Sequence, residues 1–79
     1  MKITYYAGAA DAAGTTTCEI TVTELTATEL LTRLAEGNPR LRDVLPHCSL
    51  LVDGSPVSDA SAAILGTARV DILPPFAGG

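Results

Sequence analysis

The sequence RVDILPPFAGG, residues 69–79, ends the chain and decides how the rest of it is interpreted. Its first four residues alternate between charged and apolar side chains, which predicts a strand with one buried face. Two prolines then fix φ and hold the backbone extended, and the last two residues are glycines without side chains. Because most C-termini end in a few disordered polar residues, this order predicts a domain over residues 1–73 and a functional tail over residues 74–79.

Length and charge limit the kind of protein. The chain has 79 residues, enough for one small domain, and nine acidic residues against five basic ones give a net charge of −4. Lys2 is the only lysine and the basic residues form no stripe, so nucleic acid is not an expected partner. The N-terminus lacks a long apolar segment, and a soluble cytoplasmic protein is therefore expected.

Two strands are predicted ahead of the first long helix. KITYYA, residues 2–7, is rich in β-branched and aromatic residues, and alternation would place Ile3, Tyr5 and Ala7 on one face. TTTCEITVT, residues 15–23, alternates more strictly, with apolar residues at every second position. Residues 8–14 break the first strand, with room for one helical turn, so we expect the two strands to pair as a hairpin.

A helix start follows directly. Thr26 and Glu29 have the T-x-x-E spacing of a capping box, in which each side chain accepts a hydrogen bond from the other residue's backbone N–H. Gly37 can take the left-handed conformation that ends a helix. NPRLRDVL, residues 38–45, is typical of a second short helix with Asn38 as its cap and proline in its first turn.

The remaining elements complete an α+β roll. SLLV, residues 49–52, is a short apolar strand, and Asp53-Gly54 is a turn signal before an edge segment that contains Pro56. The following residues return toward the sheet and lead into the final strand. The order predicts a mixed sheet with one main helix packed across it, and the first and last strands parallel in its middle.

These elements and the tail together resemble the ubiquitin-like sulfur carriers of β-grasp fold. Within that group the chain most resembles the small subunit of molybdopterin synthase, the MoaD family, over nearly its whole length. LLVDGSPV, residues 50–57, is similar to the family's central strand, turn and edge segment, and VDILPPFAGG, residues 70–79, is the sharpest match. The chain departs from the family in its loops, for example with Asp53-Gly54 where the family often has Asn-Gly.

The resemblance implies a carrier and not an enzyme by itself. In such proteins the terminal carboxylate, here that of Gly79, is adenylated with ATP on an E1-like, MoeB-like adenylyltransferase. Sulfur from a donor then replaces the leaving group, and the resulting thiocarboxylate donates sulfur to a larger, MoaE-like catalytic subunit that forms the dithiolene of molybdopterin. No bound cofactor is expected, because ATP is used by the activating partner. Metal, membrane and nucleic acid are not expected to be bound either.

The composition of the tail fits insertion into a narrow channel. Gly78 and Gly79 let bare backbone pass where a Cβ would obstruct it, and Ala77 before them carries only a methyl group. Pro74 and Pro75 stiffen the stem, so that less conformational entropy is lost on insertion. Phe76, the only phenylalanine, is a candidate anchor in an apolar groove of the partner. Leu73 is expected to face outward, opposite to Ile72, and to form an interface with Phe76. The open alternative for Phe76 is packing back onto the domain's own surface.

Three other functions remain open from the sequence. The first is a carrier of the same chemistry that serves thiamine or cysteine synthesis. The second is a protein modifier that conjugates through Gly79 to lysines of target proteins. The third is a binding module whose tail is incidental.

Two cysteines are further candidates. His47 and Cys48 are adjacent, but neighbours on an extended chain point to opposite faces, which argues against a Cys-His nucleophile. Cys18 lies on the apolar side of its strand and is interpreted as core. Asp53, Asp59 and Asp71 show no metal-loop spacing.

Overall fold

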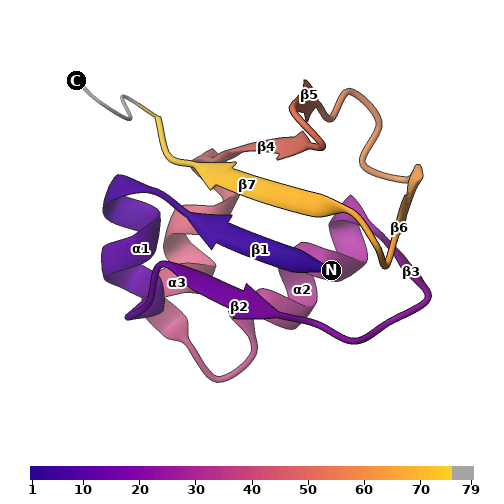
Figure 1. Ribbon diagram of the computed structural model, residues 1–79. Coiled ribbons are helices and arrows are strands. Elements are labelled where there is room, and N and C mark those ends of the chain that lie inside the picture. The colour runs from indigo at the N-terminus through magenta and orange to yellow at the C-terminus, as the bar shows by residue number, and fades with distance from the viewer. Residues whose placement is uncertain (76–79) are drawn as a thin grey trace.

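The computed structural model describes residues 1–75. In chain order its elements are β1 (Lys2–Tyr5), α1 (Ala7–Ala13), β2 (Thr17–Glu19), β3 (Glu24–Thr26), α2 (Ala27–Ala35), α3 (Pro39–Val44), a 3₁₀ turn η1 (Leu45–His47), β4 (Ser49–Val52), β5 (Ser55–Pro56), β6 (Ala63–Leu65) and β7 (Arg69–Leu73). Figure 1 shows the main sheet in front, with the helices packed against its back and its left-hand end.

The main sheet has five strands in the order β2-β1-β7-β4-β5. The first and last strands are its parallel neighbours, with Lys2 opposite Arg69 and Tyr5 opposite Ile72. All other neighbours in this sheet are antiparallel. The predicted mixed sheet with parallel first and last strands in its middle is therefore confirmed.

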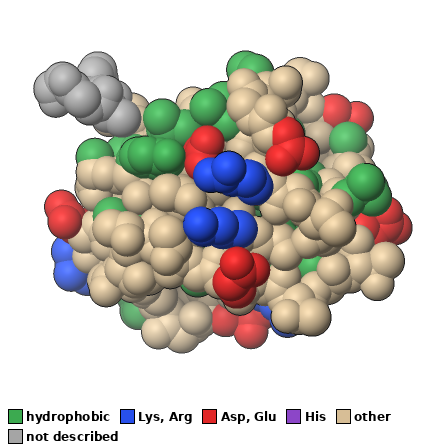
Figure 2. Space-filling model, in the orientation of Figure 1, with side chains coloured by type: hydrophobic (Ala, Val, Ile, Leu, Met, Phe, Trp, Pro, Cys, Tyr) green, Lys and Arg blue, Asp and Glu red, His purple; other side chains and the backbone are tan. Residues whose placement is uncertain are grey.

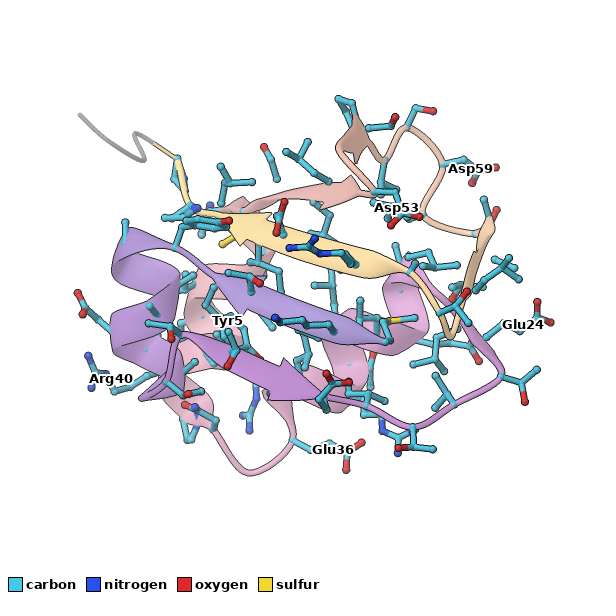
Figure 3. All side chains as sticks on the ribbon, viewed as in Figure 1. Tyr5, Glu24, Glu36, Arg40, Asp53 and Asp59 are labelled. Carbon is cyan, nitrogen blue, oxygen red and sulfur yellow. The ribbon has the colours of Figure 1, made fainter. Side chains whose placement is uncertain are left out.

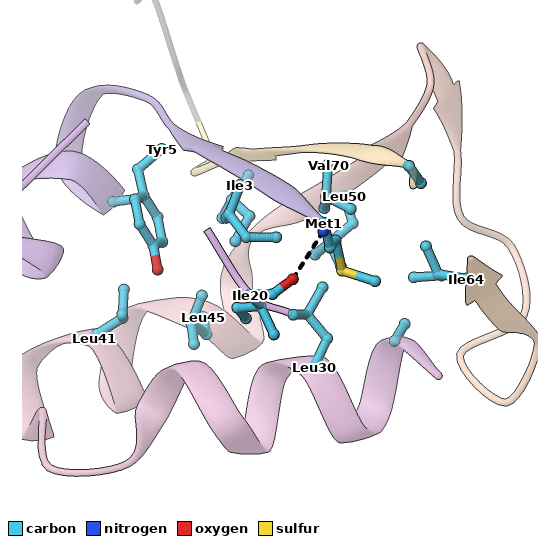
Figure 4. Packing of buried hydrophobic residues seen from close by; sticks show 14 of the residues in the cluster. Met1, Ile3, Tyr5, Ile20, Leu30, Leu41, Leu45, Leu50, Ile64 and Val70 are labelled. Carbon is cyan, nitrogen blue, oxygen red and sulfur yellow. Dashed lines mark hydrogen bonds between the residues drawn. The ribbon is translucent and has the colours of Figure 1, made fainter. Parts of the chain in front are cut away.

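One hydrophobic core lies between the sheet and the helices. Ile3, Val70 and Ile72 from β1 and β7 are fully buried, as is Leu30 from α2. Figure 4 shows the sheet residues pointing toward the helices, where Leu30, Leu41 and Leu45 meet them. Within residues 1–75, no helix lies on the opposite face of the main sheet, which is called the open face below (Figure 1). The expected α+β roll is thus confirmed, with α2 as the longest of its helices.

The capping box predicted for the main helix is present. Thr26 Oγ1 accepts a hydrogen bond from Glu29 N at 3.1 Å, and Glu29 Oε1 accepts one from Thr26 N at 2.9 Å. These bonds to Thr26 lower the pKa of the exposed Glu29 carboxyl. Its contribution to folding is therefore present at neutral pH and is lost as the pH falls through this lowered pKa. The second short helix also begins as predicted, since Asn38 Oδ1 accepts from Leu41 N at 3.0 Å.

We expect Thr26→Ala to destabilise the domain by about 1 kcal/mol, because the N–H of Glu29 loses its acceptor at the start of α2. Thr32→Ala is the matched control. Thr32 lies inside the same helix, where alanine has the higher helix propensity, so its replacement should be neutral or slightly stabilising. Urea unfolding of both variants measures the difference, and equal stabilities would show that the cap contributes nothing.

Two local predictions were wrong. β1 ends at Tyr5 and Ala7 already begins α1, so Ala7 is exposed and does not share the buried face of Ile3 and Tyr5. The second strand was predicted over residues 15–23 but is regular only over Thr17–Glu19, and the link from β1 holds the seven-residue helix α1 where one helical turn was expected. The antiparallel pairing of the two strands is nevertheless as expected.

The segment before the last strand also differs from the expectation. β6 does not join the main sheet but pairs with β3 in a separate two-stranded sheet. Gly66 follows β6 and donates its N–H to Thr23 O at 2.7 Å. A Cβ built on Gly66 would lie 1.8 Å from Val22 O, so the two segments can approach this closely only because residue 66 is glycine.

The turn between β4 and β5 is the one that its sequence predicted. Asp53 and Gly54 both have positive φ, 49° and 85°, which is the backbone of a two-residue hairpin turn. Asp53 also joins the turn to β7, since its Oδ1 accepts from Arg69 N at 3.0 Å and its N donates to Arg69 O at 2.9 Å. Figure 3 shows Asp53 beside the start of β7.

Candidate functional site

The strand that leads into the tail is held from both sides. β7 lies between β1 and β4, and its last residue, Leu73, is opposite Ser49. Tyr6 N donates to Ile72 O at 3.1 Å, so the backbone is bound up to the point where the tail begins. Because Ile72 is also fully buried, the base of the tail has a fixed position in the domain.

The residues after the buried strand become steadily more exposed. Leu73 and Pro74 are partly buried, and Pro75 is exposed. The placement of Leu73 opposite to Ile72 is as predicted, since Ile72 faces the core. Phe76, Ala77, Gly78 and Gly79 lie outside the described residues, so their predicted roles, and the division of the chain after residue 73, stay predictions.

The open face of the sheet carries an aromatic residue that sequence reasoning missed. Tyr6 follows β1 and is 43% exposed, whereas Tyr5 before it is buried. Alternation along the strand could have identified it, because a buried Tyr5 requires an outward Tyr6. Tyr6 lines a shallow hollow of about 430 Å³ together with Asp53, Gly54, Arg69 and Asp71. Figure 2 shows hydrophobic side chains on the side of this face from which the tail departs.

The centre of the open face is charged. Lys2 on β1 has Arg69 of β7 as its neighbour on one side and Glu19 of β2 on the other. Figure 2 shows two basic side chains side by side near the middle of this face, with acidic side chains around them. The site thus has two parts. Beside the tail lies an apolar margin made by Tyr6, Leu73, Pro74 and Pro75, and at the centre lies the basic pair Lys2 and Arg69.

The environment of Cys48 does not activate its thiol. Cys48 is half-buried, and its thiol donates to Val44 O at 3.3 Å. Burial raises the pKa of the Cys48 thiol, which favours the unreactive protonated form. This agrees with the prediction that His47 and Cys48 are not a catalytic pair.

Cys18 belongs with the core, as predicted. It packs against the buried cluster, and its sulfur lies 3.7 Å from the hydroxyl of Tyr5. Burial, together with the bond to Cys18, raises the pKa of the Tyr5 phenol well above its usual value. Tyr5 therefore stays protonated and serves packing.

Metal-binding clusters and membrane spans are both absent from residues 1–75. In this range no three His, Cys, Asp or Glu side chains are grouped so that they could hold a metal ion. None of the helices in this part of the chain has the length and apolar character needed to cross a membrane.

Solved structures with the same fold come from Haloferax volcanii. The crystal structure of its SAMP1 superposes with a TM-score of 0.81 at 24% identity, over 100% of this chain and 98% of that one. A crystal structure of small archaeal modifier protein 1 gives 0.79 at 22% identity, over 96% and 97%. The solution structure of the HVO 2177 protein gives 0.76 at 23% identity, over 99% and 84%. At these identities the likeness establishes the β-grasp fold.

Comparison with curated proteins gave no significant match. The family comparison is more specific than the structural one, because it identifies a family and the structural likeness at these identities identifies only a fold. The model described as "ThiS family" matches residues 3–79, which includes every strand of the main sheet and both terminal glycines. The chain therefore belongs to the ThiS family.

Proposed function

We propose that this protein is a sulfur carrier and the small subunit of a molybdopterin synthase. The observation that carries the proposal is the position of β7. This central strand is hydrogen-bonded on both sides and delivers a Leu-Pro-Pro stem to the surface at its end. The four residues that follow, Phe-Ala-Gly-Gly, lie within the part of the chain that the ThiS family model matches and resemble the ending of the MoaD family.

The proposed chemistry takes place at Gly79. Its carboxylate attacks the α-phosphorus of ATP on an E1-like activating enzyme, pyrophosphate leaves, and an acyl-adenylate forms. A sulfur donor then displaces AMP, and the product is a thiocarboxylate. Because the reacting atom is the chain's own terminus, the domain needs only to bind its partners and present the tail, and it requires no catalytic pocket of its own.

The proposed docking surface is the apolar margin of the open face. Leu73, Pro74 and Pro75 leave the sheet on the side where Tyr6 is exposed. An exposed patch of this kind, continuous with a functional tail, commonly marks an interface. We propose that the larger MoaE-like subunit covers this margin and receives the tail, with Phe76 as an anchor.

We expect Phe76→Ala to weaken binding to the larger subunit by about 1–3 kcal/mol, the range for a buried aromatic anchor. The melting temperature of the free domain should not change. Leu65→Ala is the matched control, since Leu65 is 63% exposed but lies on β6, outside the main sheet. Calorimetric titration measures both affinities. A Phe76→Ala variant with lower stability and unchanged affinity would place Phe76 in the carrier's own core and the interface elsewhere.

Reconstitution tests the molybdopterin assignment. The thiocarboxylated chain is mixed with the larger subunit and the pterin precursor, and molybdopterin is measured as its fluorescent oxidation product. Formation of molybdopterin in proportion to the thiocarboxylate supports the assignment. A thiocarboxylate that instead supports only thiazole or cysteine formation, with their respective synthases, would move the carrier to one of those pathways.

A second candidate function is protein modification. It is favoured by one observation: the solved structures with TM-scores of 0.81 and 0.79 are titled SAMP1 and small archaeal modifier protein 1. The same activated Gly79 would then be attacked by an amine of a target protein in place of sulfur. The two functions share the activation step and differ in the nucleophile.

A further inference from the structure

We propose that Lys2 is the amine through which one copy of this chain is joined to the activated C-terminus of another. The inference rests on the proposed function, since it requires Gly79 to be activated. The inference goes beyond the proposed function by naming the acceptor amine. The product would be an amide between the Gly79 carbonyl of one copy and Lys2 Nζ of the next.

The 79 residues offer two amines, the N-terminal one and the side chain of their single lysine. The N-terminal amine is not available in the folded protein. It donates to Ile20 O at 2.8 Å in a buried hydrogen bond, and Met1 is only 7% exposed within the core. Figure 4 shows this bond between Met1 and Ile20 among the buried side chains. Acylation there would remove a buried bond and force Met1 out of the core.

Lys2 has the opposite environment. Ile3 is fully buried, so its neighbour Lys2 points to the open face of the sheet, where it is exposed. None of the helices in the described part of the chain covers this face. Lys2 lies on a strand that is paired on both sides, so the position of its Cα atom is fixed. An amide at Lys2 Nζ therefore costs neither a buried contact nor a backbone hydrogen bond.

The acceptor must belong to a second copy. β1 and β7 are parallel and Lys2 is opposite Arg69, so the chain leaves β7 at the end of the strand that is far from Lys2. Four residues of strand separate them, roughly 13 Å at about 3.3 Å per residue. Pro74 and Pro75 then disfavour a reversal within the six-residue tail. A tail from another molecule has no such restriction.

The reaction balances without an oxidant or reductant. Lys2 Nζ, after losing a proton to solvent base, attacks the carbonyl carbon of the Gly79 acyl-adenylate. The new C–N bond forms, the bond from that carbon to the phosphate oxygen breaks, and AMP leaves. The ammonium formed in the attack releases its second proton to solvent. The ATP consumed in activation is the only other reactant.

Chemical activation tests the acceptor without the activating enzyme. The full chain is prepared with a thioester at Gly79 by thiol cleavage of an intein fusion and is incubated folded at pH 8. An α-amino group in an unfolded chain is deprotonated at lower pH than a lysine side chain, so simple reactivity favours Met1. In the folded protein the Met1 amine is buried and Lys2 is exposed, so the proposal expects Lys2 to react in preference to Met1. Trypsin then gives residues 1–33 carrying residues 70–79, and fragmentation locates the amide.

We expect covalent dimers with at least tenfold more amide at Lys2 than at Met1, and reversal of this preference in guanidinium chloride. Lys2→Arg should abolish the folded-state product. Adding Arg69→Lys should restore it, because the amine then stands on the adjacent strand of the same face. Predominant Met1 linkage in the folded protein, or product that forms only within one molecule, would overturn the proposal.

The proposed function and the acceptor assignment can fail separately. If cells make no thiocarboxylate or adenylate at Gly79, the proposed function is wrong, whereas the thioester experiment is unaffected. If the thiocarboxylate forms but the thioester never joins to Lys2 in the folded chain, only the acceptor assignment is wrong.

Discussion

A chain that lacks Gly79 should fold normally and lose sulfur transfer completely. The last strand ends at Leu73, and among residues 1–75 the buried cluster extends no further along the chain than Ile72. Because glycine has no side chain to bury, we expect removal of residue 79 to leave this cluster unchanged. The reacting carboxylate, in contrast, would be one residue short of its position on the activating enzyme. One residue of extended chain is about 3.3 Å, and a misplacement of about 1 Å can already cost about a hundredfold in rate.

Thiocarboxylate formation with ATP, the activating enzyme and a sulfur donor measures this loss, and thermal unfolding measures the fold. Gly79→Ala is the matched control. It keeps the length of the chain and its terminal carboxylate, so it should retain measurable transfer. If the shortened chain is thiocarboxylated at the rate of the parent, the terminal residue does not carry the reaction.

Gly66→Ala should cause an unusually large loss of stability for the addition of a single methyl group. The new Cβ would lie 1.8 Å from Val22 O, and the atoms in the way are backbone, which cannot rotate aside. The segment must shift and weaken the Gly66–Thr23 hydrogen bond as well as the small β3–β6 sheet. We expect a cost of about 3 kcal/mol, at the upper end for overpacking, and a fall in melting temperature of roughly 12–24 °C for a domain of this size.

Gly8→Ala tests whether the effect is specific to the position. A Cβ on Gly8 meets nothing within 4 Å, and the residue lies in α1, where alanine is the better helix former. Its stability should be unchanged or higher by up to about 1 kcal/mol. Differential scanning calorimetry compares the two variants. Equal melting temperatures would mean that Gly66 has room for a side chain and that its close contact with residue 22 is not needed.

The elements with strong local signals were predictable from the sequence. The Thr26 and Glu29 side chains can satisfy backbone donors only at a helix start, and Asp53-Gly54 matches the positive φ values of a two-residue turn. The alternation of residues 69–73 correctly separated Val70 and Ile72 from the outer face. In each of these cases the determining contacts lie within a few residues of one another.

The parts that were missed depend on distant contacts. β3 and β6 are three residues each, too short for a periodic pattern, and they exist because each supplies the other's hydrogen bonds across some 40 residues of sequence. The residues around Gly66 give no sign of its role, since that role depends on where residue 22 lies in space. The burial of the Met1 amine could not be predicted from the sequence either, because it depends on the position of Ile20 O in the fold.

The candidate site divides in the same way. Its chemistry was predicted from the tail, through the resemblance of VDILPPFAGG to the ending of a family of sulfur carriers. Its surroundings were not, because the predicted parallel pairing of the first and last strands does not give the register that places Lys2 opposite Arg69 on the face where Tyr6 lies. The sequence therefore indicates which atom reacts, and the fold indicates which surface a partner meets.

The most direct test of the sulfur-carrier proposal is the mass of the terminus itself. The protein is purified from its own cells after deletion of the gene for the larger subunit, so that the donor form accumulates, and the intact chain is fragmented in a mass spectrometer. We expect a population in which one oxygen is replaced by sulfur, with the increment confined to fragments that contain Gly79. A chain that carries only the unmodified carboxylate under these conditions, or sulfur located on Cys18 or Cys48 and not on Gly79, would contradict the proposal.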